Sequence, residues 1–340
     1  MLCCSLAFSQ EASDRGGYAE LSVIPRLDLN PMWNTGDNSF GFDLGNSSLY
    51  TLFEGSASEH FSWTIANHWL SAGSWIEDGV DALKMFKALG YSDSVNWLDF
   101  CKADLSFGNW TFTLGKDCIT TGGHEYEDWD WEVHPVLASP LWNGLSPYQW
   151  GGKVAYTTPS EMSTFSLQMT TSPFGERPFS SGLYAYSAQW SGEYGWFLPL
   201  WSVTALAREA PVTSSAPRDY DFLISLGNQF QLDDWTLTLD WSNSCGLSED
   251  YDRLLKGQTF HGRVDYAPLE SFEVSLRGNY MITDKSVYSG NAFSVGTALH
   301  YYPLQDSQDL RLHAVFAYDS LLSNFTASFG VLYNLCFNLW

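Results

Sequence analysis

Residues 325–340, FTASFGVLYNLCFNLW, end the chain with a nearly regular alternation of apolar and polar side chains. Every odd position from Phe325 to Leu339 is apolar, and most even positions are small or polar, with Leu332 and Cys336 as exceptions. Successive side chains of a β-strand point to opposite faces, so this stretch predicts a strand with one apolar face. A long terminal strand of this kind is typical of a closed membrane β-barrel, because its last strand must pair with its first.

The composition also favours a membrane barrel. The chain has 340 residues, of which 45% are hydrophobic and 16% are aromatic. No run of about 18 apolar residues occurs, which excludes a transmembrane helix. Rings at the two membrane interfaces would account for the 16 Trp, 18 Tyr and 22 Phe. The alternative is an aromatic-rich extracellular β-sandwich, such as a glycan-binding lectin.

The charge and the cysteines limit the partners and the sites that can be expected. A net charge of -23 would repel phosphate, so no nucleic acid partner is expected. The first residues, MLCCSLAFSQEAS, have the apolar run and polar continuation of a signal peptide. Residues 1–13 are therefore predicted to be a signal-peptide remnant and residues 17–340 a barrel. The cysteines lack CxxC spacing, so we expect no disulfide framework, metal site or cofactor.

A template of period two divides the chain into about 16 candidate strands. They begin near Tyr18, Ser47, His60, Asn96, Asn109, Tyr148, Met162, Gly182, Tyr194, Tyr220, Asp234, Gln258, Phe272, Ala292, Gln308 and Phe325. Even-numbered strands end in short turns, such as residues 107–109, and odd-numbered strands end mostly in longer segments, such as residues 30–46. This asymmetry is typical of bacterial outer-membrane barrels, which have short periplasmic turns and long extracellular loops. We therefore predict an all-β, antiparallel transmembrane barrel with an even number of strands.

Two passages carry a family resemblance. They are LSFGNWTFTLGKDCITTGGHEYEDWDW, residues 105–131, and GVLYNLCFNLW, residues 330–340. In its alternation of short turns and long loops the chain resembles the 16-stranded bacterial porins, and these passages are similar to the phosphate-selective porin O and P group. The resemblance implies a homotrimer surrounded by outer-membrane lipid and lipopolysaccharide, with the third extracellular loop folded into a water-filled channel.

The third long loop, residues 118–147, contains the most distinctive cluster. Its carboxylates and rings are Glu125, Glu127, Asp128, Asp130, Glu132, Trp129 and Trp131, and no Lys or Arg occurs between Lys116 and Lys153. If the loop folds inward, its carboxylates would favour cations or neutral polar solutes, and its rings could stack on sugars. A phosphate-selective channel would be expected to have a basic loop, so the sequence departs from that group here. A calcium site and a solvated surface segment are the rival interpretations.

Side-chain parity assigns the charges of the strands to the face away from lipid. This predicted pore lining comprises Arg26, Lys102, Asp104, Lys153, Asp240, Arg263, Asp265, Glu273, Arg277 and Arg311. On the lipid face at the membrane midplane, an Arg or Lys would cost roughly 2 to 4 kcal/mol. Some opposite charges, such as Arg263 and Asp265, lie close together on one strand. They predict either ion pairs that stiffen the wall or a transverse electric field that orients dipolar solutes.

The sequence therefore predicts a porin for passive diffusion of small hydrophilic solutes or ions, with a constriction formed by the acidic third loop. An enzyme is not predicted, because the chain has no GxSxG motif and no marked trio of Ser, His and acid. A barrel that displays surface loops as an adhesin or antigen is the main alternative, and a barrel enzyme is the second.

Overall fold

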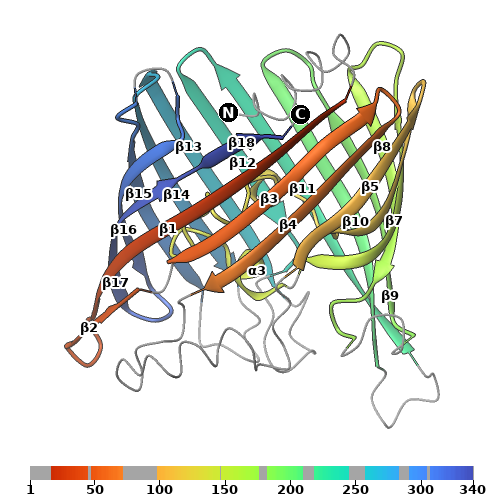
Figure 1. Cartoon of the computed structure of the whole chain (residues 1–340). Helices are drawn as coiled ribbons and strands as arrows, with labels where there is room; N and C mark the ends of the chain where they lie inside the picture. Colours follow the sequence, from red (N-terminus) through yellow and green to blue (C-terminus); the bar gives the residue numbers. More distant parts are fainter. Residues whose placement is uncertain are drawn as a thin grey trace.

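The computed structural model describes residues 17–44, 47–71, 98–145, 147–175, 182–209, 218–244, 257–282, 291–304 and 307–339. The described strands form one antiparallel sheet that closes into a barrel (Figure 1). Within these ranges no helix has the length and apolar character needed to cross a membrane. The predicted signal-peptide remnant, residues 1–13, lies outside the described residues.

The wall is built from long strands joined to their sequence neighbours. The strands are β1 (Tyr18–Asn34), β2 (Ser39–Asp43), β3 (Ser48–Ser58), β4 (Phe61–Ser71), β5 (Leu98–Phe107), β6 (Trp110–Cys118), β7 (Tyr148–Thr157), β8 (Ser163–Thr171), β9 (Tyr184–Gly192), β10 (Phe197–Glu209), β11 (Arg218–Leu232), β12 (Trp235–Ser242), β13 (Gln258–Leu269), β14 (Phe272–Ile282), β15 (Ala292–Tyr301), β16 (Leu310–Asp319), β17 (Asn324–Tyr333) and β18 (Leu335–Asn338). Two of these 18 strands are accessory. The short β2 pairs with the end of β1, and β18 continues β17 after Asn334, so the wall has 16 strands.

The first strand closes the cylinder. On one side β1 pairs with β3, and on the other it pairs with β17 and β18, where Arg26 lies opposite Leu332 and Glu20 lies opposite Asn338. The pairing of the last strand with the first, which the terminal alternation predicts, is therefore confirmed. The predicted class, an antiparallel transmembrane barrel of about 16 strands, is also confirmed.

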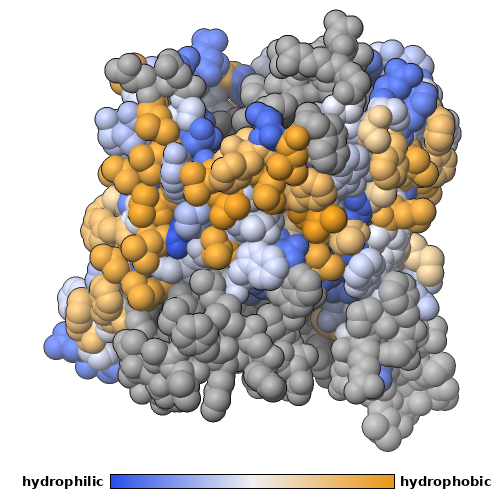
Figure 2. All heavy atoms as spheres, viewed as in Figure 1, coloured by the Kyte–Doolittle hydropathy of each residue, from blue (hydrophilic) through white to orange (hydrophobic). Residues whose placement is uncertain are grey.

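The two faces of each strand differ in polarity. On β1, Leu27 and Leu29 are exposed on the outside, whereas Arg26, Asp28 and Asn30 are buried on the inside. The exposed apolar side chains recur around the barrel, and Figure 2 shows them as a belt across its middle with hydrophilic residues toward the rims. An outer apolar belt around a polar interior is what a lipid environment requires. A β-sandwich would bury this apolar face, so that alternative is excluded.

The two rims have connections of different length, as expected. Residues 108–109 link β5 to β6 at the rim near β18, which is the upper rim in Figure 1, whereas residues 119–147 link β6 to β7 at the other rim.

One predicted boundary is wrong. Residues 30–46 were expected to form a loop, but β1 continues to Asn34 and forms a hairpin with β2, in which Trp33 lies opposite Phe40. Trp33 also stacks on Phe325 of β17, with 6.1 Å between ring centroids, and this contact stabilises the extended end of β1.

Candidate pore constriction

The loop between β6 and β7 contains a short 3-10 helix, His124–Tyr126, and α3, Pro140–Gly144. It begins with a sharp bend, because Gly122 and Gly123 have φ of 88° and 80°, a region that favours glycine. A side chain at Gly123 would also meet the carboxylate of Asp240 on β12. After the bend the loop lies against inner side chains of the wall, and Figure 1 shows α3 between the front and back strands.

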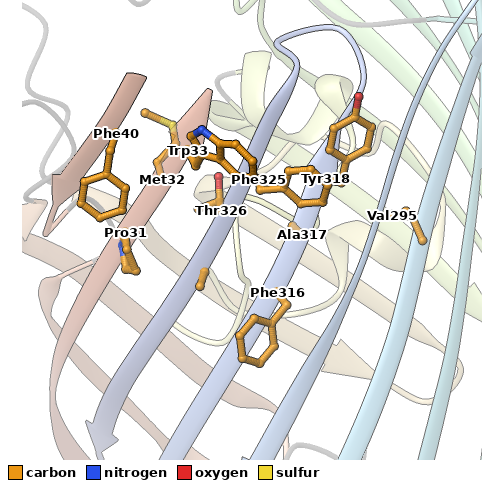
Figure 3. A pocket seen from close by; sticks show the side chains of 11 residues that line it. Pro31, Met32, Trp33, Phe40, Val295, Phe316, Ala317, Tyr318, Phe325 and Thr326 are labelled. Atoms are coloured by element: carbon orange, nitrogen blue, oxygen red, sulfur yellow. The ribbon is translucent and has the colours of Figure 1, made fainter. Parts of the chain in front are cut away.

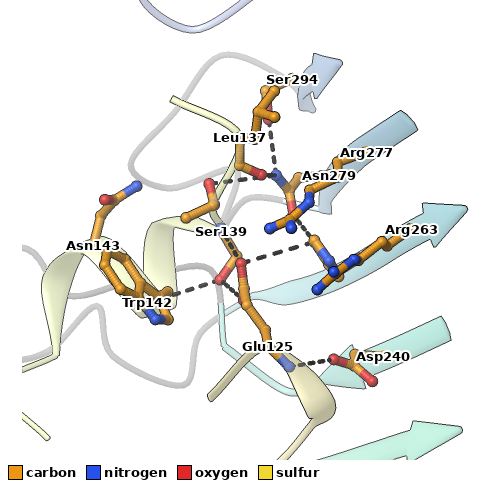
Figure 4. Close-up of polar contacts among 12 residues, drawn as sticks. Glu125, Leu137, Ser139, Trp142, Asn143, Asp240, Arg263, Arg277, Asn279 and Ser294 are labelled. Atoms are coloured by element: carbon orange, nitrogen blue, oxygen red, sulfur yellow. Dashed lines mark hydrogen bonds and ion pairs between the residues drawn. The ribbon is translucent and has the colours of Figure 1, made fainter. Parts of the chain in front are cut away.

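One group of anchors joins the loop to β12, β13 and β14 (Figure 4). The backbone N–H of Glu125 donates to Oδ2 of Asp240 at 3.1 Å, and Nη1 of Arg263 lies 2.6 Å from Oδ2 of Asp128. Nδ2 of Asn279 donates to the carbonyl of Leu137 at 3.2 Å. The loop is therefore fixed on this side at several points along its length.

Glu125 has a structural role within the loop. Its side chain is 8% exposed, and it accepts hydrogen bonds from the backbone N–H and the hydroxyl of Ser139 at 2.5 Å each. The same hydroxyl accepts from the backbone N–H of Trp142 and thereby caps α3. Glu125 therefore holds the two short helices of the loop together.

A second group of anchors comes from β1 and β16. Arg26, which is 5% exposed, donates through Nη1 to the carbonyls of Trp131 and Val133 at 2.9 and 2.7 Å. Nη2 of Arg311 donates to the Trp131 carbonyl at 3.3 Å. Arg26 also pairs with Asp28 at 2.8 Å. Two arginines that parity places on the inner face thus bind loop carbonyls.

Apolar contacts complete the attachment. Trp131 and Trp129 stack with 4.6 Å between ring centroids, and Trp131 packs on Ile24, Tyr50 and Leu332 from the wall. Leu332, which breaks the alternation of the last strand, therefore faces inward onto the loop. The contacts of Ile24 and Tyr50 with the loop were not predicted from the sequence. An apolar residue at a strand position whose side chain points into the barrel, such as Ile24 between Ser22 and Arg26, is the signal that could have identified them.

The five loop carboxylates have different environments. Glu125 binds Ser139, as described, and Glu127 lies 2.9 Å from Nδ1 of His124. Asp128 pairs with Arg263 at 2.6 Å and approaches Arg277 at 3.9 Å. Burial alone would raise the pKa of Asp128, but these two guanidinium groups hold it below its ordinary value. Asp128 therefore carries a negative charge that the wall neutralises.

Asp130 and Glu132 are different, since no ion pair joins either to a basic side chain in the described part of the chain. Burial raises the pKa of Asp130 to about 6, and its hydrogen bond with Tyr148 opposes that shift only in part. Glu132 is exposed. Of the five carboxylates, Glu132 and Glu127 are thus the ones most open to solvent.

The predicted pore-lining charges form ion pairs mainly across strands. Arg263 and Asp265 lie 2.5 Å apart, as expected for neighbours along one strand. Lys102 instead pairs with Asp117 of β6 at 3.0 Å, and Lys153 of β7 reaches the same carboxylate at 2.9 Å. Lys102 lies opposite Gly115 and Lys153 lies opposite Thr113, so both long side chains reach Asp117 diagonally across the strands.

The remaining lining residues also contact other elements. Asp104 accepts a hydrogen bond from Thr113 of β6. Glu273 lies 3.7 Å from Nδ1 of His300 on β15. In the ranges that the structure describes, no group of three or more His, Cys, Asp or Glu side chains is placed to bind a metal ion.

A separate apolar depression of about 430 Å³ lies on the outer face of the barrel (Figure 3). It is lined by Pro31, Met32, Trp33, Phe40, Val295, Phe316, Ala317, Tyr318, Phe325, Thr326 and Ala327. These residues belong to β1, β2, β15, β16 and β17, near the end of β1 that carries the hairpin. The depression is therefore part of the apolar outer surface and separate from the loop.

No protein-family model matches the sequence, and no curated protein matches it. The fold is similar to that of the outer membrane channel DcaP of Acinetobacter baumannii, with a TM-score of 0.61, 12% identity, and coverage of 94% of this chain and 98% of that one. It is also similar to OmpT of Vibrio cholerae lacking loop L8, an outer membrane protein, with a TM-score of 0.58, 10% identity, and coverage of 94% and 100%. A mutant Rh. blastica porin gives a TM-score of 0.58 at 12% identity, with coverage of 93% and 100%. These similarities extend over nearly the whole chain and establish the fold of an outer-membrane barrel.

Proposed function

We propose that this protein is a porin of the bacterial outer membrane, through which small hydrophilic solutes or ions diffuse. The observation that carries the proposal is the closed wall of 16 strands with an apolar outside and a charged inside. Barrels of about this size enclose a water-filled channel, whereas barrels of about eight strands are filled by their own side chains. The porins and channels among the similar structures support the same function.

The loop of residues 118–147 is proposed to form the constriction. Its carbonyls and carboxylates bind Arg26, Arg311 and Arg263, which lie on β1, β16 and β13. On another part of the wall its rings contact Tyr50 of β3 and Phe100 of β5. A loop held at well-separated strands narrows the lumen, and charges of both signs around it would orient dipolar solutes.

The selectivity is proposed to be a weak preference for cations. Asp128 is neutralised by arginine and Glu125 is bonded within the loop, so these two carboxylates contribute little to the field in the pore. Glu132 and Glu127 are exposed, and the loop has no basic side chain except His124 and His134. A phosphate-selective channel, which the resemblance to the porin O and P group would imply, is disfavoured by this acidic loop.

Conductance across planar lipid bilayers tests the proposal. The purified protein should produce stepwise openings, and reversal potentials in a KCl gradient should show a modest cation preference. Replacing Asp130 and Glu132 by their amides should weaken that preference, because neither carboxylate forms an ion pair with a basic side chain in the described ranges. The matched control replaces Glu209 by glutamine at the exposed end of β10, and its selectivity should be unchanged. Absence of openings, or a marked anion preference, would refute the proposal.

The proposed partners are outer-membrane lipid, lipopolysaccharide and, by resemblance to porins, two further copies of the chain. In a homotrimer a neighbouring subunit would cover part of the apolar outer surface, and in a monomer acyl chains would do so. Chemical cross-linking in the native membrane distinguishes these cases. An adhesin function would be indicated by cell binding without conductance, and a barrel enzyme by hydrolysis without conductance.

A further inference from the structure

A chain of four side chains connects the loop to the wall next to the carbonyl anchors. Nη2 of Arg26 on β1 lies 3.0 Å from Nδ1 of His134 in the loop. Nε2 of His134 lies 2.9 Å from Nε2 of His300 on β15. Nδ1 of His300 lies 3.7 Å from Oε1 of Glu273 on β14. His134 is fully buried and His300 is 4% exposed, so water does not take the place of these contacts.

The chemistry of the groups determines where the protons are. A guanidinium group only donates, so Nδ1 of His134 must accept and its single proton must be on Nε2. That N–H donates to His300, whose Nε2 must therefore be unprotonated. The remaining proton of His300 is then on Nδ1, which faces the carboxylate of Glu273. The contact between the two rings thus exists only while Nε2 of His300 is unprotonated.

Addition of one proton to His300 breaks this arrangement. Nε2 of His300 would become an N–H directed at the N–H of His134, which is 2.9 Å away, and two donors cannot share a hydrogen bond. His134 cannot relieve the conflict by turning its acceptor atom toward His300, because Arg26 occupies Nδ1. Protonation therefore converts a hydrogen bond into a repulsive contact inside the barrel.

The charged surroundings select His300 as the ring that takes the proton. Burial, together with Arg26 of β1 and Arg311 of β16, holds the pKa of His134 well below its ordinary value. His313 of β16 also faces the ring of His134, but its own Nε2 is hydrogen-bonded to Asp28 of β1 at 2.7 Å.

On β14, Glu273 and Arg277 face His300, Arg311 and His313 face it from β16, and Tyr302 follows it at the end of β15. Among the described residues, the carboxylate of Glu273 stabilises the protonated form of His300, whereas burial and the two arginines oppose it, so this ring takes up a proton only in acid.

We propose that the contact between His134 and His300 is a proton-controlled anchor of the constriction loop. The inference rests on the proposed channel function. At neutral pH the anchor is intact and residues 131–139 are held against β15. In acid the anchor is lost while the bonds from Arg26 and Asn279 to loop carbonyls remain. The stretch around His134, between these remaining bonds, then moves toward and away from β15 and interrupts the current.

Single-channel recording as a function of pH tests this anchor. The open current should be steady near about pH 7 and should break into brief closures in acid. Because one proton is involved, the ratio of closed to open time should rise about tenfold for each pH unit below the transition. The variant His300→Gln offers an acceptor that does not titrate, so its closures should be independent of pH. The control His60→Gln changes an exposed histidine in the turn between β3 and β4 and should behave as the unmodified protein does.

Two results would overturn the proposal. One is an uninterrupted current in acid, and the other is the same acid response in His300→Gln. Hydrogen exchange decides independently if this variant does not fold or if no channel forms at any pH. The amide of Leu137, which donates to the carbonyl of His134 at 2.8 Å, should lose protection in acid after correction for the intrinsic rate. Unchanged protection of Leu137 would refute the anchor, whereas the absence of any channel would refute the proposed function.

Discussion

Replacement of Arg26 by methionine should reveal how strongly the wall holds the loop. Arg26 is 5% exposed, pairs with Asp28 at 2.8 Å, and donates to the carbonyls of Trp131 and Val133. Removing one partner of a buried ion pair costs about 3 to 5 kcal/mol, because the other charge remains buried. His313 still binds Asp28 at 2.7 Å, which lowers the cost, but the variant also loses the two hydrogen bonds to loop carbonyls, which raises it. We therefore expect Arg26→Met to lower the free energy of unfolding by about 3 to 5 kcal/mol.

The assay is urea unfolding of the protein folded in lipid vesicles, followed by tryptophan fluorescence. The control is Glu59→Gln in the turn between β3 and β4, where the carboxylate lies 3.4 Å from Nε2 of His60. Because the side chains of both residues are exposed, this change should cost no more than about 1 kcal/mol. Equal losses in the two variants, or a loss of less than about 1 kcal/mol for Arg26→Met, would refute the assigned anchoring.

Three further predictions concern the loop and the lipid face. Gly296→Leu on β15 should displace Leu137, which a side chain there would meet, and should lower the free energy of unfolding by about 1 to 3 kcal/mol. Because burial raises the pKa of Asp130 to about 6, its charge appears only as pH rises through that value. The cation preference measured by reversal potential should therefore increase between about pH 5 and pH 7, and Asp130→Asn should abolish the increase. Leu114→Arg at the middle of β6 should cost about 2 to 4 kcal/mol in vesicle unfolding, and Leu321→Arg at the rim about 0 to 1; equal costs would contradict the assigned lipid face.

The fold was predictable because lipid on one side and water on the other impose a strict alternation on every strand. The predicted starts at Asn96 and Tyr194 lie close to the observed starts at Leu98 and Phe197. The extension of β1 was missed, since Asn30 and Pro31 are common in loops. Asn30 is in fact buried on the inner face. Pro31 lies opposite Phe42 in the hairpin of β1 and β2, where a missing N–H is tolerated.

The constriction was predictable only in part. Parity placed Arg26 and Arg311 on the inner face, but it cannot say which loop atoms they meet, because Arg26 and Trp131 are 105 residues apart in the chain. Counting carboxylates also overestimated the free charge of the loop, since the partner of Asp128 is an arginine on β13. Glycines at strand positions that face the inside of the barrel were an overlooked signal of close contact with the loop. Gly296 leaves room for Leu137 and Gly227 for Gly123.

The most direct test of the central claim is whether the acidic loop lies in a water-filled lumen. In a background without native cysteines, Glu132→Cys should react with a charged methanethiosulfonate reagent, and its single-channel current should fall on modification. Leu239→Cys, whose side chain is exposed on the outer face of β12, is the matched control and should leave the current unchanged. Failure of the reagent to alter the current through Glu132→Cys channels would contradict the account.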